Sequence, residues 1–263
     1  MSSDTASQAL ISARNIISAG LDYVRSGETS DQNQVFLYEL AHATAALSIS
    51  ESFISFGENG EEEKYMVDVF CADTLRSIAD MSFGLEEIWG IEKSDLEQLK
   101  NFVASHGTPQ NYSKVASMKA NSYLSDELQL VADTFRRFGR EHIEHLAEKV
   151  HREDLDVPES VIEGLADLGC FGLSIPQKYG GTAIGSALDN YGMVIATEEL
   201  SRASLSIGGS LITRPEILAR AIENGGTEKQ KKELLPKIAS GNYMSAVAVT
   251  EPDHGSDVAS ITT

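Results

Sequence analysis

The chain has 263 residues, of which 41% are hydrophobic, and a formal net charge of −19 from 40 acidic and 21 basic residues. This hydrophobic content is sufficient for buried cores and excludes a wholly disordered chain. The acidic balance argues against nucleic acid and an anionic membrane as partners, because both require a basic surface. No apolar stretch reaches the roughly 18 residues needed to span a bilayer.

The two cysteines and the N-terminus indicate the compartment. Cys71 and Cys170 lie far apart and lack metal-ligand spacing, so neither a disulfide framework nor a zinc site is predicted. Asp4 precedes any basic residue and no hydrophobic signal core follows, which argues against secretion. We therefore expect a cytoplasmic protein whose thiols are reduced and buried.

The first 120 residues have helical spacing. An apolar stripe in residues 34–56 and a second one in residues 65–81 predict an antiparallel helix pair, joined by a polar break at residues 58–63. The first stripe repeats at steps of four and three residues and consists of Phe36, Leu40, Ala43 and Leu47. Residues 101–122 have few large apolar residues, and we expect a linker and the main domain boundary there.

Residues 123–241 carry several helix start and stop signals. Ser125 is a suitable N-cap for a helix to about Val150. Pro158 suits a first helical position, and Gly169 suits a stop. The apolar face of the first of these helices consists of Leu128, Val131, Phe135 and Phe138.

A capping box predicts the last helix of this region. Thr227 and Gln230 stand three residues apart, so each side chain can accept from the backbone N–H group of the other. Pro236 is expected to end or bend that helix. The Gly208-Gly209 pair is expected to interrupt the helical pattern before it.

The helical period changes to an alternating one after residue 241. Val247 and Val249 alternate with smaller residues, which predicts a strand that is half buried. Pro252 cannot continue a strand ladder, and Gly255 permits a close backbone approach. A turn of this kind, with Ser256 after it, presents hydroxyl and backbone N–H groups suited to a phosphate or a polar ring edge.

Four segments resemble the acyl-CoA dehydrogenase family, in the order that the family has them. They are similar to its Gly-rich entry loop, the helix that follows, its linker helix and its flavin signature. Together they cover roughly residues 125–263. The segments are LADLGCFGLSIPQKYGG (165–181), EELSRAS (198–204), GTEKQKKELLPKIASG (226–241) and AVAVTEPDHGSD (246–257).

The resemblance implies a mainly α fold that ends at the start of a β-barrel domain. Residues 1–120 would be a helical N-terminal extension, residues 123–241 the family's N-terminal helical domain, and residues 242–263 the truncated beginning of its middle β-barrel domain. The family's catalytic glutamate lies in the C-terminal four-helix domain, and nothing here matches it. We therefore expect no catalytic residue in this chain and no activity from this fragment alone.

The resemblance also implies a reaction, which is the FAD-dependent α,β-dehydrogenation of an acyl-CoA thioester. A carboxylate removes the α proton in a dry pocket with donors to the developing enolate, and the β hydrogen leaves as hydride to the flavin. The implied partners are the acyl-CoA substrate and the electron-transfer flavoprotein as electron acceptor. Relatives are commonly homo-oligomers that assemble largely through the C-terminal domain.

The family's flavin-contacting stretch falls on five residues of this chain: Val247, Val249, Thr250, Gly255 and Ser256. The residue that matches Ser256 also touches acyl-CoA in relatives. The alternative is a turn at a strand end that any β domain uses. Asp253-His254 departs from the family pattern, in which many relatives have two small residues here, and this puts the local phosphate geometry in question.

The extension and the segment SLITRPEILARAIENGGTEKQ are similar to one branch of the family, which oxidises (2S)-methylsuccinyl-CoA to mesaconyl-CoA in the ethylmalonyl-CoA pathway. The free carboxylate of that substrate needs a paired cation, for which arginine is best suited. Arg214 is the candidate substrate-binding residue, with Thr213 beside it. The alternative is a solvated arginine at a helix start.

Two other functions stay open at this point. The chain can belong to a branch that acts on fatty acyl-CoA or benzylsuccinyl-CoA, or it can be a non-catalytic helical assembly protein. A metal site is not expected. Glu148 and His151 form a single Glu-x-x-His motif, whereas a di-metal carboxylate bundle needs this motif on two helices.

Overall fold

The computed structural model describes residues 3–26, 33–119 and 121–263, without the side chains of residues 3–5, 89, 187, 188 and 214. The chain divides into two compact units, Met1–Asn121 and Ser122–Thr263. We describe each unit by itself. No helix in the described ranges is long and apolar enough to cross a membrane.

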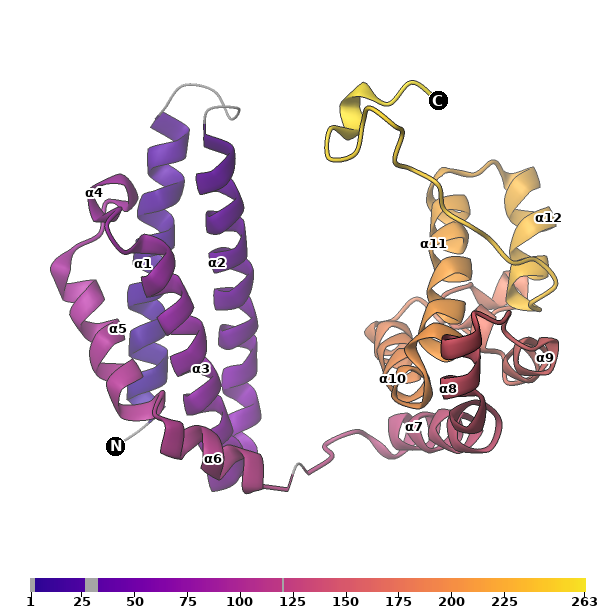
Figure 1. Ribbon diagram of the computed structural model, residues 1–263, viewed down its shortest axis with the longest axis horizontal. Helices are drawn as coiled ribbons and strands as arrows, with labels where there is room; N and C mark the ends of the chain where they lie inside the picture. Colours follow the sequence, from indigo (N-terminus) through magenta and orange to yellow (C-terminus); the bar gives the residue numbers. More distant parts are fainter. Residues whose placement is uncertain (1–2, 27–32, 120) are drawn as a thin grey trace. The chain divides into compact units, whose positions relative to one another are not determined.

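The first unit is a bundle of helices around one hydrophobic core (Figure 1). Its helices are α1 (Ser3–Ser26), α2 (Gln34–Phe53), α3 (Glu61–Ser82), α4 (Glu86–Trp89), α5 (Lys93–His106) and α6 (Pro109–Ser117). Helices α2 and α3 pack side by side after a short 3₁₀ connection, as the two apolar stripes predict. The fully buried side chains Ile16, Leu40, Leu75 and Leu99 come from α1, α2, α3 and α5, so all four helices contribute to the core.

Most of residues 101–122 are helical, so the predicted linker is much shorter than expected. Helix α5 continues to His106, and the Thr108 hydroxyl caps α6, in which Pro109 is the first residue. This segment is packed through polar contacts that its composition does not reveal. Arg76 donates to the Gly107 carbonyl, and the Tyr65 hydroxyl donates to the Asn111 side chain at 2.7 Å.

The second unit is also helical (Figure 1). It contains α7 (Asp126–Phe138), α8 (Glu144–Glu153), α9 (Glu159–Asp167), α10 (Ala187–Ala203), α11 (Ser210–Gly225) and α12 (Glu228–Ala239). Two predicted caps are confirmed: the Ser125 hydroxyl accepts from the Leu128 N–H group, and Thr227 and Gln230 form both bonds of a capping box. Pro158 is the N-cap of α9 and not its first helical residue. Pro236 does not end the last helix, because α12 continues to Ala239. The proline removes only one backbone N–H donor from this helix.

Two π turns interrupt the helical pattern of the second unit. The stretch predicted as one helix from Ser125 to about Val150 contains a π turn at Gly139–Ile143 between α7 and α8. The second π turn, Leu205–Gly209, includes the predicted Gly208-Gly209 interruption. Gly208 is required there, because a Cβ atom at this position would lie 2.6 Å from the Leu200 carbonyl oxygen.

Residues 243–250 do not form the predicted strand. The segment has no regular secondary structure, and in the described part of the chain the isolated bridge from Pro176 to Ala183 is the only β-type pairing. The alternating pattern alone does not make this segment a strand, because a strand forms only when a neighbouring strand completes its hydrogen bonds. The mainly α fold itself is confirmed.

Candidate functional site

The C-terminal segment turns sharply after residue 250, as Pro252 predicts. The Glu251 N–H group donates to the His254 carbonyl at 3.0 Å, and the His254 N–H group donates back at 3.3 Å. The Glu251 carboxylate accepts from the backbone N–H groups of Thr262 and Thr263. Hydrogen bonds from Thr263 and then Thr262 lower the pKa of Glu251 to about 2. This carboxylate therefore stays ionised and holds the end of the segment against the turn.

The five predicted flavin contacts lie along this one exposed segment rather than in an enclosed pocket. Val247 and Val249 are 53% and 51% exposed, and the three others, Thr250, Gly255 and Ser256, are also exposed. A Cβ atom at Gly255 would meet only the Thr250 methyl group, at 3.8 Å, so the backbone there is open to a ligand. The assignment of these five residues as flavin contacts stays a prediction.

Arg214, the predicted substrate-binding residue, lies in α11. Its side chain is outside the described part of the molecule. The neighbouring Thr213 hydroxyl donates to the Ser210 carbonyl at 3.2 Å, within its own helix. Arg214 as a carboxylate-binding group remains a prediction.

A buried ion pair joins α7 to α10, and the sequence reasoning missed it. Arg136 donates twice to Glu199, whose side chain is only 3% exposed. Arg202 donates to the same carboxylate at 3.3 Å. The hydrogen bond from Arg136 is the largest cause that lowers the pKa of Glu199, so this carboxylate is ionised near neutral pH. The ion pair joins the two helices.

The Gly-rich segment after α9 is held by backbone contacts. Its bridge from Pro176 to Ala183 brings the two sides of the loop together. The Asp189 carboxylate at the start of α10 accepts from the N–H groups of Ile184, Gly185 and Ser186, the last two at 2.7 and 3.0 Å. These bonds are the cause of a lowered pKa of Asp189, so the capping carboxylate is charged at neutral pH.

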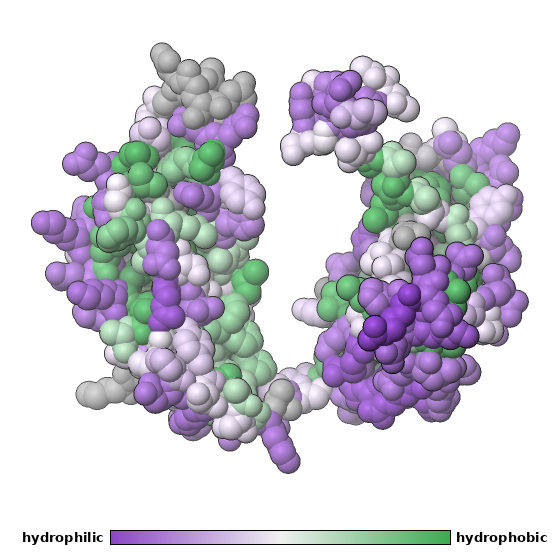
Figure 2. Space-filling view, viewed as in Figure 1, coloured by the Kyte–Doolittle hydropathy of each residue, from purple (hydrophilic) through white to green (hydrophobic). Residues whose placement is uncertain are grey.

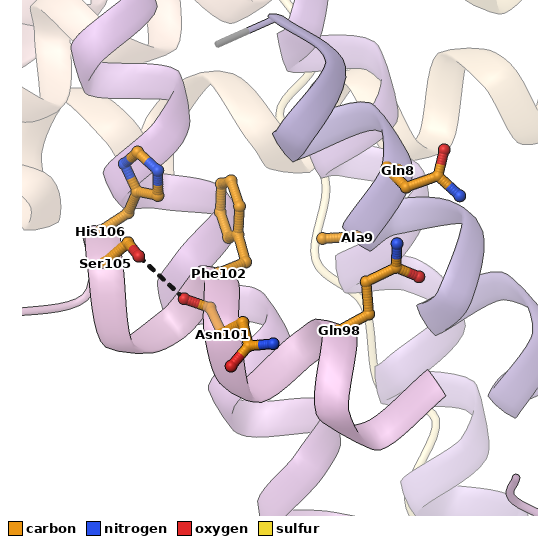
Figure 3. Close-up of a pocket in the computed structure, with 7 residues that line it drawn as sticks. All are labelled: Gln8, Ala9, Gln98, Asn101, Phe102, Ser105 and His106. Carbon is orange, nitrogen blue, oxygen red and sulfur yellow. Dashed lines mark hydrogen bonds between the residues drawn. The ribbon is translucent and has the colours of Figure 1, made fainter. Parts of the chain in front are cut away.

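A separate hollow of about 390 Å³ lies between α1 and α5 in the first unit (Figure 3). The Phe102 ring at its floor stacks on His106, with ring centroids 4.4 Å apart. The Gln98 side chain is fixed by the Ser12 hydroxyl at 2.6 Å. The lining contains amide, hydroxyl and imidazole groups but no carboxylate and no Lys or Arg. It consists of Gln8, Ala9, Gln98, Asn101, Phe102, Ser105 and His106.

In the described ranges, no group of three or more His, Cys, Asp and Glu side chains has an arrangement that could hold a metal ion. His142, which precedes α8, packs against the Phe138 ring, with ring centroids 4.7 Å apart.

The helical second unit and its Gly-rich loop are similar to a known family of proteins. Residues 125–242 match the family model described as "Acyl-CoA dehydrogenase, N-terminal domain". This match lies within the second unit.

Two relatives show how far the similarity extends. The (2S)-methylsuccinyl-CoA dehydrogenase of Cereibacter sphaeroides is 39% identical over 176 residues, which cover 64% of this chain and 31% of that protein. The mitochondrial isovaleryl-CoA dehydrogenase of Pongo abelii is 34% identical over 139 residues, which cover 52% of this chain and 32% of that protein. The chain thus spans about a third of the length of these curated relatives. The first match is longer than the second unit, so it includes part of the first unit.

Among solved structures, the glutaryl-coenzyme A dehydrogenase in its glutaryl-CoA complex is 33% identical to this chain. The similarity covers 55% of this chain and 36% of that one, with a TM-score of 0.46.

Proposed function

We propose that the protein containing this chain catalyses the FAD-dependent α,β-dehydrogenation of an acyl-CoA thioester. The observation that carries the proposal is the match of residues 125–242 to the family's N-terminal domain, followed directly by the turn at residues 250–256. The relatives named above are dehydrogenases of acyl-CoA thioesters. When bound, FAD supplies the acceptor for the hydride.

The residues of this chain would bind and orient the cofactor rather than transfer protons. Val247 and Val249 would cover the apolar ring of the flavin and exclude water from it. The hydroxyl groups of Thr250 and Ser256, with the backbone N–H groups near Gly255, would donate to the polar ring edge and the phosphates. Ser256 would also contact the acyl-CoA. The base would come from outside this chain, so this fragment alone would be inactive.

The substrate that we propose is (2S)-methylsuccinyl-CoA, oxidised to mesaconyl-CoA in the ethylmalonyl-CoA pathway. The 39% identity to a (2S)-methylsuccinyl-CoA dehydrogenase supports this choice. Arg214 would bind the free carboxylate of the substrate through two parallel N–H···O bonds. The electron acceptor would be the electron-transfer flavoprotein, and the protein would be a cytoplasmic homo-oligomer.

The test uses the product of the whole reading frame. We expect a yellow protein whose flavin absorbance is bleached by (2S)-methylsuccinyl-CoA but not by butyryl-CoA. Bleaching by butyryl-CoA instead would assign the protein to another branch of the family. A colourless protein that does not take up added FAD would contradict the proposed function and would favour a non-catalytic assembly role.

Arg214→Ala in the same protein tests the carboxylate site. The Michaelis constant should rise more for a dicarboxylic acyl-CoA than for a plain one, because only the former has a carboxylate to lose its partner. Arg202→Ala is the control, since Arg202 already contacts Glu199 and Glu198. An equal effect of Arg214→Ala on both substrates would remove Arg214 from the site.

A further inference from the structure

The hollow between α1 and α5 is lined by side-chain amides with unused hydrogen-bonding groups. In the part of the chain that the structure describes, the carboxamides of Gln8 and Asn101 form no hydrogen bond. The Gln98 Oε1 atom accepts from the Ser12 hydroxyl at 2.6 Å, which leaves the N–H groups of its Nε2 atom unused. A carboxamide offers donors and an acceptor side by side, so the hollow presents several such groups to a ligand.

Two aromatic rings face the glutamine side chains across the hollow. In Figure 3 the rings of Phe102 and His106 stand on one side, and the side chains of Gln8 and Gln98 stand on the other. The two rings are stacked, with an angle of 28° between their planes. Ala9 lies between the two sides and has only a methyl group, so the space stays open. A flat ligand can therefore contact the rings and the amides at the same time.

The hollow is built on well-packed parts of the first unit. Helices α1 and α5 pack against each other, and Ala9, Leu99 and Phe102 belong to the hydrophobic core. The buried Ser12 holds the Gln98 amide in one orientation. The volume of about 390 Å³ lies within the range of roughly 300–1,000 Å³ that is usual for small-molecule sites. The site is thus formed before a ligand binds.

The lining favours a neutral ligand over a charged one. A phosphate or carboxylate finds no Lys or Arg in the hollow, and an ammonium group finds no carboxylate. Each of these ions would lose its water without gaining such a partner. A neutral heterocycle has no such cost, and it gains stacking on aromatic side chains.

We propose that this hollow binds the base of an adenine nucleotide. A carboxamide of Asn or Gln pairs with adenine by two hydrogen bonds, one to N7 and one from the N6 amino group. Guanine presents O6 and N7 at the same edge, for which Arg or Lys is the usual partner, and the lining contains neither. The base stacks on the ring pair of Phe102 and His106. The sugar and the phosphates stay in solvent at the open side of the hollow, where Gln8, Asn101 and Ser105 are exposed.

Isothermal titration calorimetry of the 263-residue chain tests the proposal, which concerns the first unit and does not rest on the proposed flavin chemistry. Adenosine should bind at one site with a dissociation constant below about 1 mM, and guanosine should bind roughly tenfold more weakly. AMP and coenzyme A carry the same base, so both should compete with adenosine. The tighter of the two identifies the source of the base.

Two substitutions remove amides from the hollow. Gln98→Met keeps the length of the side chain and should weaken adenosine binding roughly fivefold or more. Asn101→Leu should have a similar effect, and it removes no side-chain hydrogen bond from the described part of the chain. Gln110→Leu is the matched control, because Gln110 is an exposed amide of α6 outside the hollow. Circular dichroism verifies that the three variants are folded.

A loss of affinity in either hollow variant, with Gln110→Leu unchanged, supports the proposal. The absence of saturable adenosine binding at millimolar concentrations would overturn it. So would binding that Gln98→Met and Asn101→Leu both leave unchanged, because the base would then lie elsewhere on the chain. Equal affinity for guanosine, or saturable binding of methyl glucoside in place of adenosine, would likewise contradict an adenine site.

Discussion

The Arg136 guanidinium holds the Glu199 carboxylate by two bonds, from Nε to Oε2 at 3.0 Å and from Nη2 to Oε1 at 2.6 Å. The Glu199 side chain is 3% exposed, whereas that of Arg136 is 35% exposed. The pair links α7 with α10, which also pack against each other. A carboxylate this deeply buried requires such a partner, because its desolvation is otherwise uncompensated.

Arg136→Gln should therefore destabilise the second unit by about 2 kcal/mol, because it leaves a buried carboxylate with only the weaker contact to Arg202. The measurement is urea unfolding of the chain, in which hydrogen exchange of peptides from α7 and α10 reports on the second unit. Arg152→Gln is the matched control, since Arg152 pairs with Glu148 at the surface and should contribute less than about 0.5 kcal/mol. Equal losses from the two substitutions would contradict a special role for the buried pair.

The same carboxylate should make the second unit sensitive to acid. The hydrogen bond from Arg136, and then its charge, lower the pKa of Glu199 below its usual value. A lowered pKa contributes stability that is present above the unfolded-state value of about 4.3 and is lost as the pH falls through the folded-state value. Stability measured between neutral pH and about pH 3 should thus decline less steeply in Glu199→Gln than in wild type. Identical slopes would show that Glu199 does not contribute.

The loop before α10 depends on one carboxylate. Asp189→Ala removes the acceptor for the N–H groups of Ile184, Gly185 and Ser186, so these three amides should exchange with solvent much faster. The loss of stability should be about 1 kcal/mol, as for other helix caps. Asp167→Ala, at an exposed position of α9, is the control and should leave loop exchange unchanged. Unchanged protection in Asp189→Ala would mean that the loop is held by its other contacts.

Both thiols should be unreactive in the folded chain. Burial raises the pKa of Cys170 to about 12, and burial together with the charge of Asp68 raises that of Cys71 to about 12. The thiolate is the reactive form, so neither residue should react with a disulfide reagent near pH 8 until denaturant is added. One or two equivalents of rapid reaction in the native chain would show that a cysteine is accessible.

Local signals predicted the starts of α7 and α12. The Ser125 cap and the Thr227–Gln230 box depend on contacts within a single turn, which a sequence shows directly. The predicted linker was too long because its helices are held by contacts between residues far apart in the sequence. The contacts that pack residues 101–117, such as Arg76 to Gly107, join residues about 30 positions apart and leave no local pattern.

The candidate site was predicted less completely than the helices. The turn after Thr250 was predicted from Pro252, because a proline has no N–H group to donate to a strand ladder and so favours a turn at its own position. The strand before it depends on a neighbouring strand, and the alternating pattern cannot supply one. The Arg136–Glu199 pair spans 63 positions, so no local pattern reveals it.

The π turn at Gly139–Ile143 explains why the spacing of core residues changes along this segment. Phe135, Phe138, Ile143 and Val150 are all buried, although the step from Phe138 to Ile143 is five residues rather than three or four. Removal of one residue from positions 139–142 would shorten this step to four residues, which is the spacing of a regular α-helix. Ile143 and Val150 would then still face the core. The wider turn therefore absorbs one residue without rotating the helix that follows it.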